Sequence, residues 1–254
     1  VFNIESSILK REEPIVQELA NEYLTEQGIT ILNNVTLESV SNDGDKPVIT
    51  ANNQNYTFDA VLYATGRKAN TANIGLEHTD IATNERGAIV VNDTCESSVP
   101  GVYAVGDVNG GPQFTYISLD DFRIVFGALT GNSQYTLKDR KNIPYTTFLT
   151  PPLSRVGLTE EDAINQGYTV KTKEMLVATM PRAHVNDYLK GAFKIVVDAD
   201  NDLILGATLY SQGAEELINL IKMAMDNNIP YTYFKNQIFT HPTMAENLND
   251  LCNF

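Results

Sequence analysis

The chain has 254 residues, a formal net charge of −14, and a hydrophobic fraction of 43%. A surface this acidic repels phosphate backbones and anionic lipids, which argues against nucleic acid as a partner. No apolar run approaches the roughly 20 residues that cross a bilayer, and no basic leader precedes an apolar stretch, so we also expect no membrane partner. The two cysteines, Cys95 and Cys252, make neither a disulfide framework nor a C-x-x-C pair, which fits a reducing, cytoplasmic setting.

The first part of the chain combines one predicted helix with several predicted strands. Apolar residues recur at helical spacing over residues 14–27, with Pro14 in the first turn and Gly28 just past the end. The predicted strands are residues 1–4, 30–35, 47–51, 55–58 and 60–64. This mixture predicts an α/β fold for the opening of the chain.

The middle of the chain is organised around one predicted strand, residues 102–105, and the acid that follows it. The strand lies between Pro100-Gly101 and Gly106, and Asp107 stands where it ends. A loop with two glycines comes next, and Thr115 begins a segment with helical spacing that should end near residues 131–132. Strand, acid, glycine loop and helix start are the parts used to bind nucleotide cofactors, because the acid accepts hydrogen bonds from sugar hydroxyls and the helix N-terminus favours negative charge.

From residue 143 onward the pattern changes to short strands and helices punctuated by proline. Thr159 is followed three residues later by an acid, which is a capping-box pattern at a helix start. Strands are predicted at residues 170–179, 192–197 and 203–210, and a helix at residues 213–225. Strands with helices packed on one face indicate an α+β domain. The acidic turn at residues 198–202 lacks the glycine and distal Glu of a calcium loop, so no metal site is expected.

Four stretches carry a resemblance to a known family. Residues 94–107 have the pattern T-x5-P-G-V-Y-A-x-G-D, which resembles the second flavin-binding signature of the pyridine nucleotide-disulfide oxidoreductases. That family includes glutathione reductase, lipoamide dehydrogenase and mercuric reductase. Residues 63–67 resemble its A-T-G-R junction, residues 143–163 the opening of its interface domain, and residues 241–246 its H-P-T-x-x-E acid/base motif.

The resemblance implies a domain order. Residues 1–66 would be the second half of an NAD(P)-binding domain, residues 67–140 the C-terminal part of an FAD-binding domain, and residues 141–254 an α+β dimerisation domain. Both nucleotide-binding domains would be partial and Rossmann-like. The family's two G-x-G-x-x-G motifs and its redox C-x4-C do not occur in this sequence. We therefore expect the chain to be the later part of a longer enzyme, and to be inactive by itself.

The resemblance also implies FAD as a cofactor and names residues for it. Asp107, with Gly106, would accept a hydrogen bond from the flavin's ribityl chain. Thr115 would lie at a helix start under the pyrimidine edge of the flavin, where the helix dipole stabilises negative charge on the reduced ring. Gly66 and Arg67 belong to the junction that enters the flavin domain. The alternative is structural: Asp107 and Thr115 would be a turn acid and a helix cap.

NAD(P)H is the second cofactor that the resemblance implies. Asn3 or Glu5 would face the adenosine ribose, with Lys10 and Arg11 nearby. An acid favours a free 2′-hydroxyl and basic residues favour a 2′-phosphate, so both NADH and NADPH remain compatible with these residues. Ordinary charges at a helix start are the competing interpretation.

His241 and Glu246 are the predicted catalytic residues. Pro242 would occupy the first position of a helix, and Glu246, one turn in, would accept the ring N–H and hold one tautomer. In the family this histidine is the acid/base for the thiol-disulfide pair of the other subunit, which implies a homodimer. His78 and His184 match no motif and are expected at the surface. Cys252 is expected to be a helix-packing thiol.

The function that we expect is electron transfer from NAD(P)H through FAD and a redox disulfide to a small-molecule disulfide or oxidant. Residues 110–123 depart from the common form of the family and resemble a branch associated with resistance to reactive chlorine or hypothiocyanous acid. Two alternatives stay open. The chain could serve as a dimerisation module without activity, or the parent could be a flavin oxidase or a coenzyme A-disulfide reductase. The motif at residues 241–246 argues against this last alternative.

Overall fold

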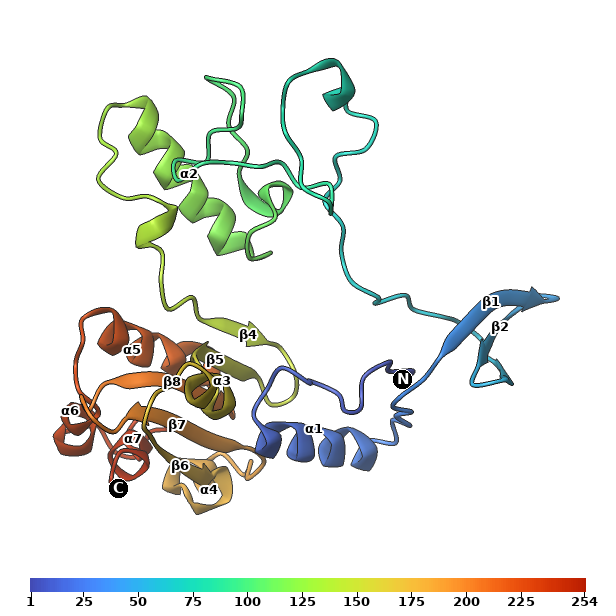
Figure 1. Ribbon diagram of the computed structural model, residues 1–254. Coiled ribbons are helices and arrows are strands. Elements are labelled where there is room, and N and C mark those ends of the chain that lie inside the picture. The colour runs from blue at the N-terminus through green and yellow to red at the C-terminus, as the bar shows by residue number, and fades with distance from the viewer. The chain divides into compact units, whose positions relative to one another are not determined.

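The computed structural model describes residues 1–254, which form two compact units (Figure 1). One unit combines residues 1–61 with residues 142–254, and the other contains residues 62–141. No helix is both long and apolar enough to cross a membrane. The domain boundaries that the resemblance implies stay a prediction.

A five-stranded antiparallel sheet forms the centre of the first unit. Its strands follow the spatial order β4 (Tyr145–Thr147), β5 (Leu153–Gly157), β8 (Ile204–Tyr210), β7 (Ala192–Asp198) and β6 (Val170–Leu176). The strand pattern read from the sequence is confirmed here, since β6, β7 and β8 fall within the predicted segments or within one residue of them. β7 and β8 are buried over nearly their whole length, as expected for central strands rich in β-branched and large apolar residues.

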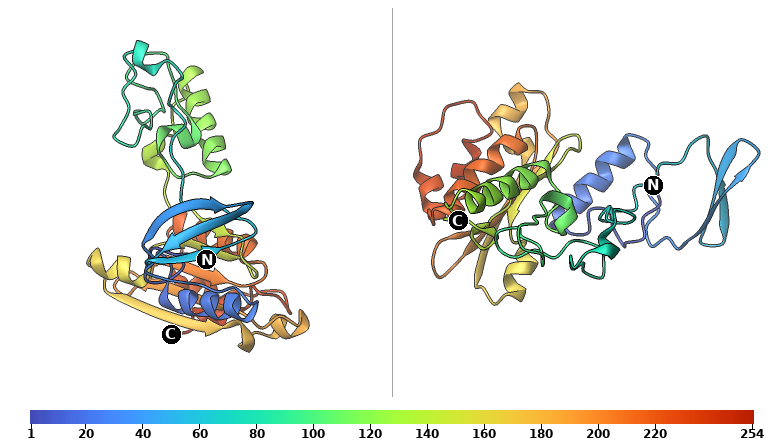
Figure 2. Two further views of the ribbon diagram at one scale, coloured as in Figure 1. Left: turned by 90° about the vertical axis from the view of Figure 1, so that its right-hand side faces the viewer. Right: turned by 90° about the horizontal axis from the view of Figure 1, so that it is seen from above.

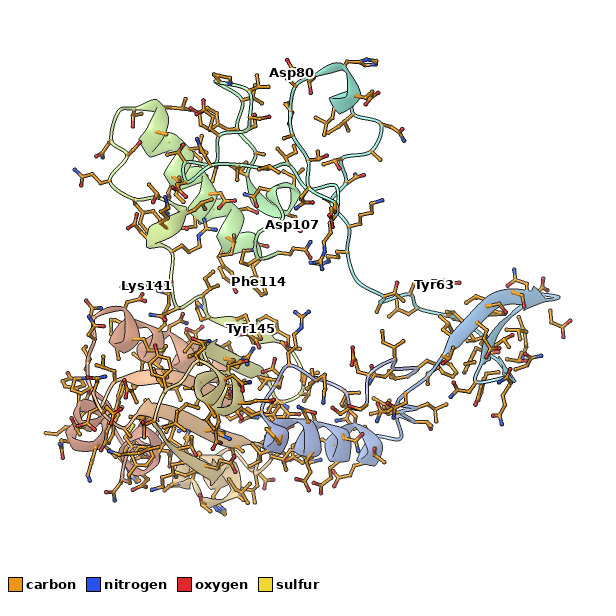
Figure 3. The ribbon with its side chains drawn as sticks, viewed as in Figure 1. Tyr63, Asp80, Asp107, Phe114, Lys141 and Tyr145 are labelled. Atoms are coloured by element: carbon orange, nitrogen blue, oxygen red, sulfur yellow. The ribbon has the colours of Figure 1, made fainter.

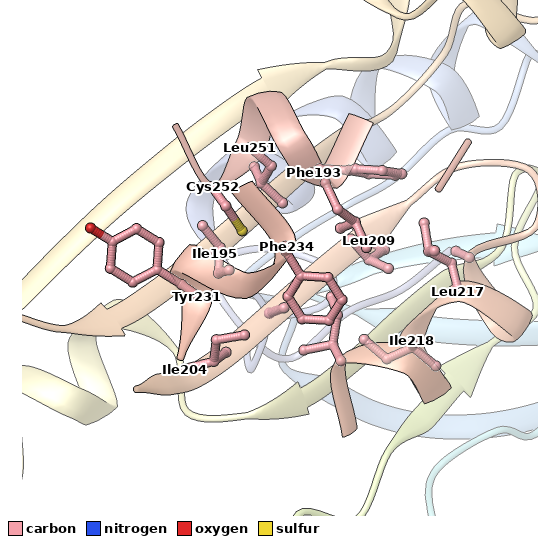
Figure 4. Close-up of a cluster of buried hydrophobic side chains, with 14 of the residues drawn as sticks. Phe193, Ile195, Ile204, Leu209, Leu217, Ile218, Tyr231, Phe234, Leu251 and Cys252 are labelled. Carbon is pink, nitrogen blue, oxygen red and sulfur yellow. The ribbon is translucent and has the colours of Figure 1, made fainter. Parts of the chain in front are cut away.

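The main hydrophobic core lies between one face of the sheet and three helices (Figure 4). The helices are α5 (Ala214–Asp226), α6 (Tyr231–Asn236) and α7 (Asn247–Leu251). Phe193, Ile195 and Leu209 enter this core from β7 and β8, and none of the three is exposed. Each fully buried side chain of this size contributes roughly 1.5–3 kcal/mol relative to an exposed one. The core also contains Cys252, whose pKa burial raises to about 12, so this thiol is a packing group as predicted.

Helix α1 (Pro14–Glu26) covers the opposite face of the same sheet, an arrangement that was not predicted from the sequence. Val16, Ala20 and Tyr23 pack against Leu153 and Tyr210, and the rings of Tyr23 and Tyr210 lie 5.9 Å apart. Figure 2 shows α1 beside the sheet from two further directions. The helix predicted at residues 14–27 is confirmed, and the residues that make its apolar stripe are the ones that contact the sheet.

A charged layer built around two buried groups, Lys194 and Glu13, accompanies α1 on this face. The Lys194 ammonium lies 3.0 Å from Glu13 and 2.6 Å from Glu160, and a third carboxylate, that of Glu174, lies 3.1 Å away. Burial opposes the charged amine, but hydrogen bonds to the three carboxylates prevail and raise the pKa of Lys194. Glu160 begins α3 (Glu160–Asn165), where the capping box expected at Thr159 is present. This layer connects α1, α3, β6 and β7.

A three-stranded antiparallel meander completes the first unit: β1 (Leu37–Asp43), β2 (Lys46–Ala51) and β3 (Gln54–Thr57). The prediction missed β1, because all of its residues are exposed and no apolar alternation marks it. The strands predicted at residues 1–4 and 30–35 are reduced to one parallel bridge between Phe2 and Leu32, and residues 60–64 form no strand. An apolar run becomes a strand only where a neighbouring strand takes up its backbone hydrogen bonds.

The second unit contains one long helix, α2 (Thr115–Leu129), and otherwise turns, loops and isolated bridges. Its short 3-10 turns are η1 (Leu76–His78), η2 (Gly106–Asn109) and η3 (Leu137–Asp139). The start and end of α2 agree with the prediction. The predicted strand at residues 102–105 is wrong: only Tyr103 pairs, in a bridge with Glu96, because no strand lies beside the remaining residues. The first unit adds two further short elements, η4 (Val177–Thr179) and α4 (Pro181–Val185).

Gly191, just before β7, offers a test of the sheet. Its φ is +120°, and an added Cβ would lie 1.8 Å from the Tyr210 carbonyl oxygen. Gly167 has φ +87° and nothing within 4 Å of an added Cβ. We expect Gly167→Ala to cost about 1–2 kcal/mol from the left-handed backbone alone. Gly191→Ala should cost at least about 2 kcal/mol more, because the backbone of β8 must also move. Urea unfolding of both variants measures this difference, and equal losses would contradict the described register of β7 and β8.

Candidate functional site

The turn that carries Asp107 is η2, and two glycines shape it. Gly106 has φ +73°, and an added Cβ would lie 2.5 Å from the Ser118 hydroxyl oxygen on α2. Gly110, just after the turn, has φ +79°, and an added Cβ would lie 2.9 Å from that of Ala88. A side chain at either position would push the turn away from its neighbours. The glycines therefore allow η2 to lie close against α2 and leave Asp107 exposed (Figure 3).

A buried carboxylate on α2 holds this turn. Asp121 is completely buried, and its Oδ2 accepts hydrogen bonds from the Gly106 backbone N–H at 2.7 Å and from the Asn109 amide at 2.9 Å. The Arg140 guanidinium donates to the other oxygen, Oδ1, and also to Asp120 at 2.7 Å. Removing one partner of such a buried charge lowers the free energy of unfolding by about 3–5 kcal/mol in typical proteins. Neither Asp121 nor Arg140 was predicted, although an acid on the same helix face as Ile117 and Ile124 signals a buried partner.

Asp107 opens into a pocket of about 400 Å³. Arg67, one of the residues that the resemblance selected, also lines this pocket. The remaining side chains at its walls are mostly polar or basic: Lys68, Asn84, Arg86 and Gln113. Arg67 and Asp107 therefore line the same pocket. An exposed carboxylate can accept from hydroxyl groups, and three basic side chains in the same pocket can neutralise phosphate.

The remaining flavin candidates, Gly66, Gly106 and Thr115, do not line this pocket, although Gly66 adjoins Arg67 and Gly106 adjoins Asp107 in the chain. Gly66 is exposed with φ +109°, next to Arg67. Gly106 is the buried first residue of η2. Thr115 is the first residue of α2 and is exposed, but Phe114 holds the cap position and no side-chain cap hydrogen bond forms. The expected place of Thr115 at the helix start is confirmed, and the alternative in which it is a helix cap is wrong, so any role in binding would come from its place in the first helical turn.

The candidates for the nicotinamide cofactor contact each other. The Asn3 side chain donates to the Glu5 carbonyl at 3.2 Å and to Asn33 at 2.8 Å, and the Glu5 N–H donates back to Asn3 at 3.3 Å. Lys10 and Arg11 line a separate cavity of about 800 Å³ in the same unit. The carboxylate of Glu5 is exposed, and the roles of Asn3 and Glu5 stay a prediction.

His241 and Glu246 form the second candidate site. His241 Nδ1 lies 2.7 Å from Glu246 Oε2, and the Thr243 N–H donates to the other carboxylate oxygen at 3.0 Å. Because a carboxylate only accepts, Nδ1 must carry the proton, and Nε2 is left to exchange one. The imidazole side chain is 68% exposed. Hydrogen bonds from His241 and Thr243 hold the pKa of Glu246 below its ordinary value of 4.5.

The helix expected to begin at Pro242 does not begin there. Residues 241–246 form turns, and α7 starts at Asn247. Glu246 accepts the Thr243 N–H and donates its own N–H to the Thr243 hydroxyl, so these two residues close a turn of their own before the helix. The predicted contact between His241 and Glu246 is nevertheless present. Its role in catalysis stays a prediction.

The remaining histidines and Cys95 lie outside both candidate sites. His78 and His184 are exposed, as expected. Cys95 is buried, and burial raises the pKa of its thiol to about 11. No group of three or more His, Cys, Asp and Glu side chains is placed to hold a metal ion.

Comparisons with known proteins identify the family. Residues 1–121 match the profile described as "Pyridine nucleotide-disulphide oxidoreductase", and residues 143–252 match that of its dimerisation domain. The chain belongs to the pyridine nucleotide-disulfide oxidoreductases. The resemblance read from the four sequence stretches is confirmed, and so is the order of nucleotide-binding parts before a dimerisation domain.

Two curated relatives show how much of the family's chain is represented. The "Probable pyridine nucleotide-disulfide oxidoreductase RclA" of Escherichia coli K12 is 42% identical over 251 residues, which is 99% of this chain and 57% of the relative. A mercuric reductase of Staphylococcus aureus is 34% identical over 245 residues, 95% of this chain and 45% of the relative. The chain therefore spans about half the length of these proteins.

A solved structure agrees with the fold. The "HOCl-induced flavoprotein disulfide reductase RclA from Escherichia coli" matches with a TM-score of 0.94 at 41% identity. The match covers 99% of this chain and 58% of that one. This relative agrees with the branch expected from residues 110–123.

The contribution of Glu246 to the stability of the fold should depend on pH. Its folded pKa lies below the ordinary 4.5, so the hydrogen bonds to its carboxylate stabilise the fold fully above that value. This stabilisation should disappear as the pH falls from about 4.5 through the lowered folded pKa. Glu246→Gln should therefore be less stable than the wild type above this window and equal to it below.

The measurement is urea unfolding at a series of pH values, with Glu18→Gln, an exposed carboxyl on α1, as the control. Because Glu246 is partly exposed, the difference is expected to be small. A stability difference that does not change across the window would contradict the described contact.

Proposed function

We propose that this chain forms the later part of an FAD-dependent enzyme that transfers electrons from NAD(P)H to a disulfide and then to a small-molecule disulfide or oxidant. Family membership supports this proposal, because the family uses FAD and NAD(P)H. The observation that carries it is that Asp107 and Arg67 line one pocket, beside a turn held by Asp121. The name of the E. coli relative, an HOCl-induced flavoprotein disulfide reductase, favours an oxidant-linked substrate.

The residues of the pocket fit the cofactor. Asp107 would accept hydrogen bonds from the sugar-alcohol chain of FAD, and Arg67, Lys68 and Arg86 would neutralise phosphate charge. When bound, FAD supplies the two-electron carrier between nicotinamide and sulfur. The first turn of α2, from Thr115, would present backbone N–H groups to negative charge. Gly106 and Gly110 keep this region free of side chains that would displace the turn.

His241 would manage protons at the sulfur centre. Its Nδ1–H is held by Glu246, which fixes the neutral tautomer and leaves Nε2 to accept a proton from a thiol and return it. The only cysteines of the chain, Cys95 and Cys252, are both buried and have raised pKa values, so neither fits a redox partner. The redox pair would come from residues outside these 254.

A homodimer would bring His241 to the sulfur centre of the other subunit. Residues 143–252 match the dimerisation domain of the family. Just before His241, Ile238 is 95% exposed and Tyr233 54% exposed, at a surface hollow of about 560 Å³. Apolar side chains this exposed favour a protein contact. We also propose a cytoplasmic location, which the two unpaired cysteines support.

A dimerisation module without activity is the second candidate. It is favoured by the lack of any cysteine pair in this chain and by the dimerisation-domain match. In both cases the purified chain alone should show no NAD(P)H turnover with added FAD. An assay of a longer protein separates the two.

The decisive protein is a chimera in which the preceding part of the E. coli relative is joined to this chain. We expect it to retain FAD and to oxidise NAD(P)H with a disulfide or oxidant. Asp107→Ala should weaken FAD binding about 10- to 100-fold, the range for a hydrogen bond to a charged group. His241→Gln should keep FAD but lower turnover by about 10²–10⁴, while His184→Gln should change neither.

Each part of the proposal can fail separately. A chimera that binds FAD equally well with Asp107→Ala would reject the flavin contact. Full turnover with His241→Gln would reject the acid/base role. A folded, FAD-loaded dimer that never oxidises NAD(P)H would leave the module as the better account.

A further inference from the structure

The loop that presents His241 is exposed, yet side chains of α7 hold both of its ends. At its start, the Asn249 amide donates to the carbonyls of Phe234 at 2.7 Å and Gln237 at 2.9 Å, with a longer contact to Lys235 at 3.3 Å. At its end, the Asn247 amide donates to the Thr243 carbonyl at 3.2 Å. Between these anchors lies residue 238, which is almost fully exposed.

The Asn249 amide contacts both the last turn of α6 and the residue that follows this helix. The last carbonyls of α6 have no partner within the helix, so a side-chain donor there has its own stabilising effect. The same amide also reaches Gln237, the first residue beyond α6 and the start of the segment that leads to His241. Together with the Gln237 N–H, which donates to the Phe234 carbonyl at 3.4 Å, this side chain sets the direction in which the chain leaves α6.

Helix α7 is itself firmly held, so it can serve as a fixed support. Leu248 and Leu251 are completely buried in the main core. The Lys173 ammonium on β6 donates to the carbonyls of Asp250 at 2.7 Å and Asn253 at 2.6 Å. A cation at the C-terminal end of a helix is favourable for the helix dipole.

We propose that Asn249 is a positioning residue that holds the His241 loop so that Nδ1 meets Glu246. This inference rests on the proposed acid/base role of His241 for its functional meaning, but the geometry can be tested without activity. If Asn249 is removed, residues 237–241 lose their side-chain anchor to α7, while Glu246, at the end of the loop, stays attached to that helix. The loop is then held by Phe239 against the main core and by the Thr243 hydroxyl, which donates to the Thr240 carbonyl at 2.7 Å. The share of molecules with Nδ1–H paired to Glu246 should then fall.

The experiment is nitrogen NMR of the full chain labelled in histidine, at about pH 8, above the ordinary pKa of free imidazole. The chain has only three histidines, and His78→Gln and His184→Gln assign the remaining signal to His241. In the wild type we expect the Nδ1–H tautomer to dominate. Asn249→Asp keeps the shape of the side chain but cannot donate a hydrogen bond. This variant should lower the ratio of the Nδ1–H tautomer to the Nε2–H tautomer of His241 about fivefold, which is the effect expected from the loss of one hydrogen bond.

Two further variants make the result specific. Asn249→Gln keeps the donors and should restore part of the ratio. Asn227→Ala is the matched control, because that amide also donates to a backbone carbonyl, that of Met223, but at the end of α5. It should leave His241 unchanged.

The proposal fails if folded Asn249→Asp shows the wild-type tautomer ratio. If that variant does not fold, Asn249→Ala decides by the same criterion. A changed tautomer together with full turnover of His241→Gln in the chimera would keep the positioning role and reject the acid/base function. An unchanged tautomer ratio in the Asn249 variant, together with lost turnover of His241→Gln in the chimera, would reject the positioning role and keep the acid/base function.

Discussion

The carboxylate of Asp121 is the interaction on which the candidate flavin site depends. The unit of residues 62–141 contains few buried apolar side chains: Ala88, Ile89, Cys95, Ala104, Ile117 and Ile124. None of the hydrophobic clusters of the structure lies in it. A fully buried acid that binds Gly106, Asn109 and Arg140 therefore connects segments that packing alone does not hold. The position of Asp107 follows from that of Gly106, its neighbour in the turn.

The unit of residues 1–61 and 142–254 also joins separate segments by buried charged contacts, but it has a larger hydrophobic core. Its sheet is packed on both faces, by α5–α7 on one and by α1 on the other, where Lys194 meets its carboxylates. The functional candidates of the two units, Asp107 and His241, are exposed, whereas the residues that fix them lie deeper in the fold. Buried polar contacts are strong where every partner is present, which suits them to holding exposed groups in one geometry.

The sequence predicted the parts of the fold that depend on local pattern. The ends of α1 and α5 were within one or two residues, because Pro14 and the apolar spacing of Leu217, Ile218 and Ile221 act within one segment. The strand at residues 102–105 failed because a strand needs a neighbour, which local sequence does not report. The same limit applies to the charged layer at Lys194, whose partners come from three separate elements.

The candidate site residues show the same contrast between contacts that depend on local sequence and contacts that join distant segments. The contact between His241 and Glu246 could be predicted, since the two residues are five positions apart and the motif is local. Arg67 and Asp107 were selected only by the family resemblance, and neither their shared pocket nor the support from Asp121 was predicted. Asp121 lies on the buried face of α2 with Ile117 and Ile124, so its position was a signal that helical spacing could have revealed.

Native-state hydrogen exchange at the backbone N–H of Gly106 tests the role of Asp121 most directly. This amide is buried and donates to Asp121, so it should be protected in the wild type, and Asp121→Ala should speed its exchange at least about tenfold. The amide of Ile195, on β7 in the other unit, is the control and should keep its rate. Exchange of Gly106 as fast as in an unfolded peptide, or a rate that Asp121→Ala leaves unchanged, would contradict this account.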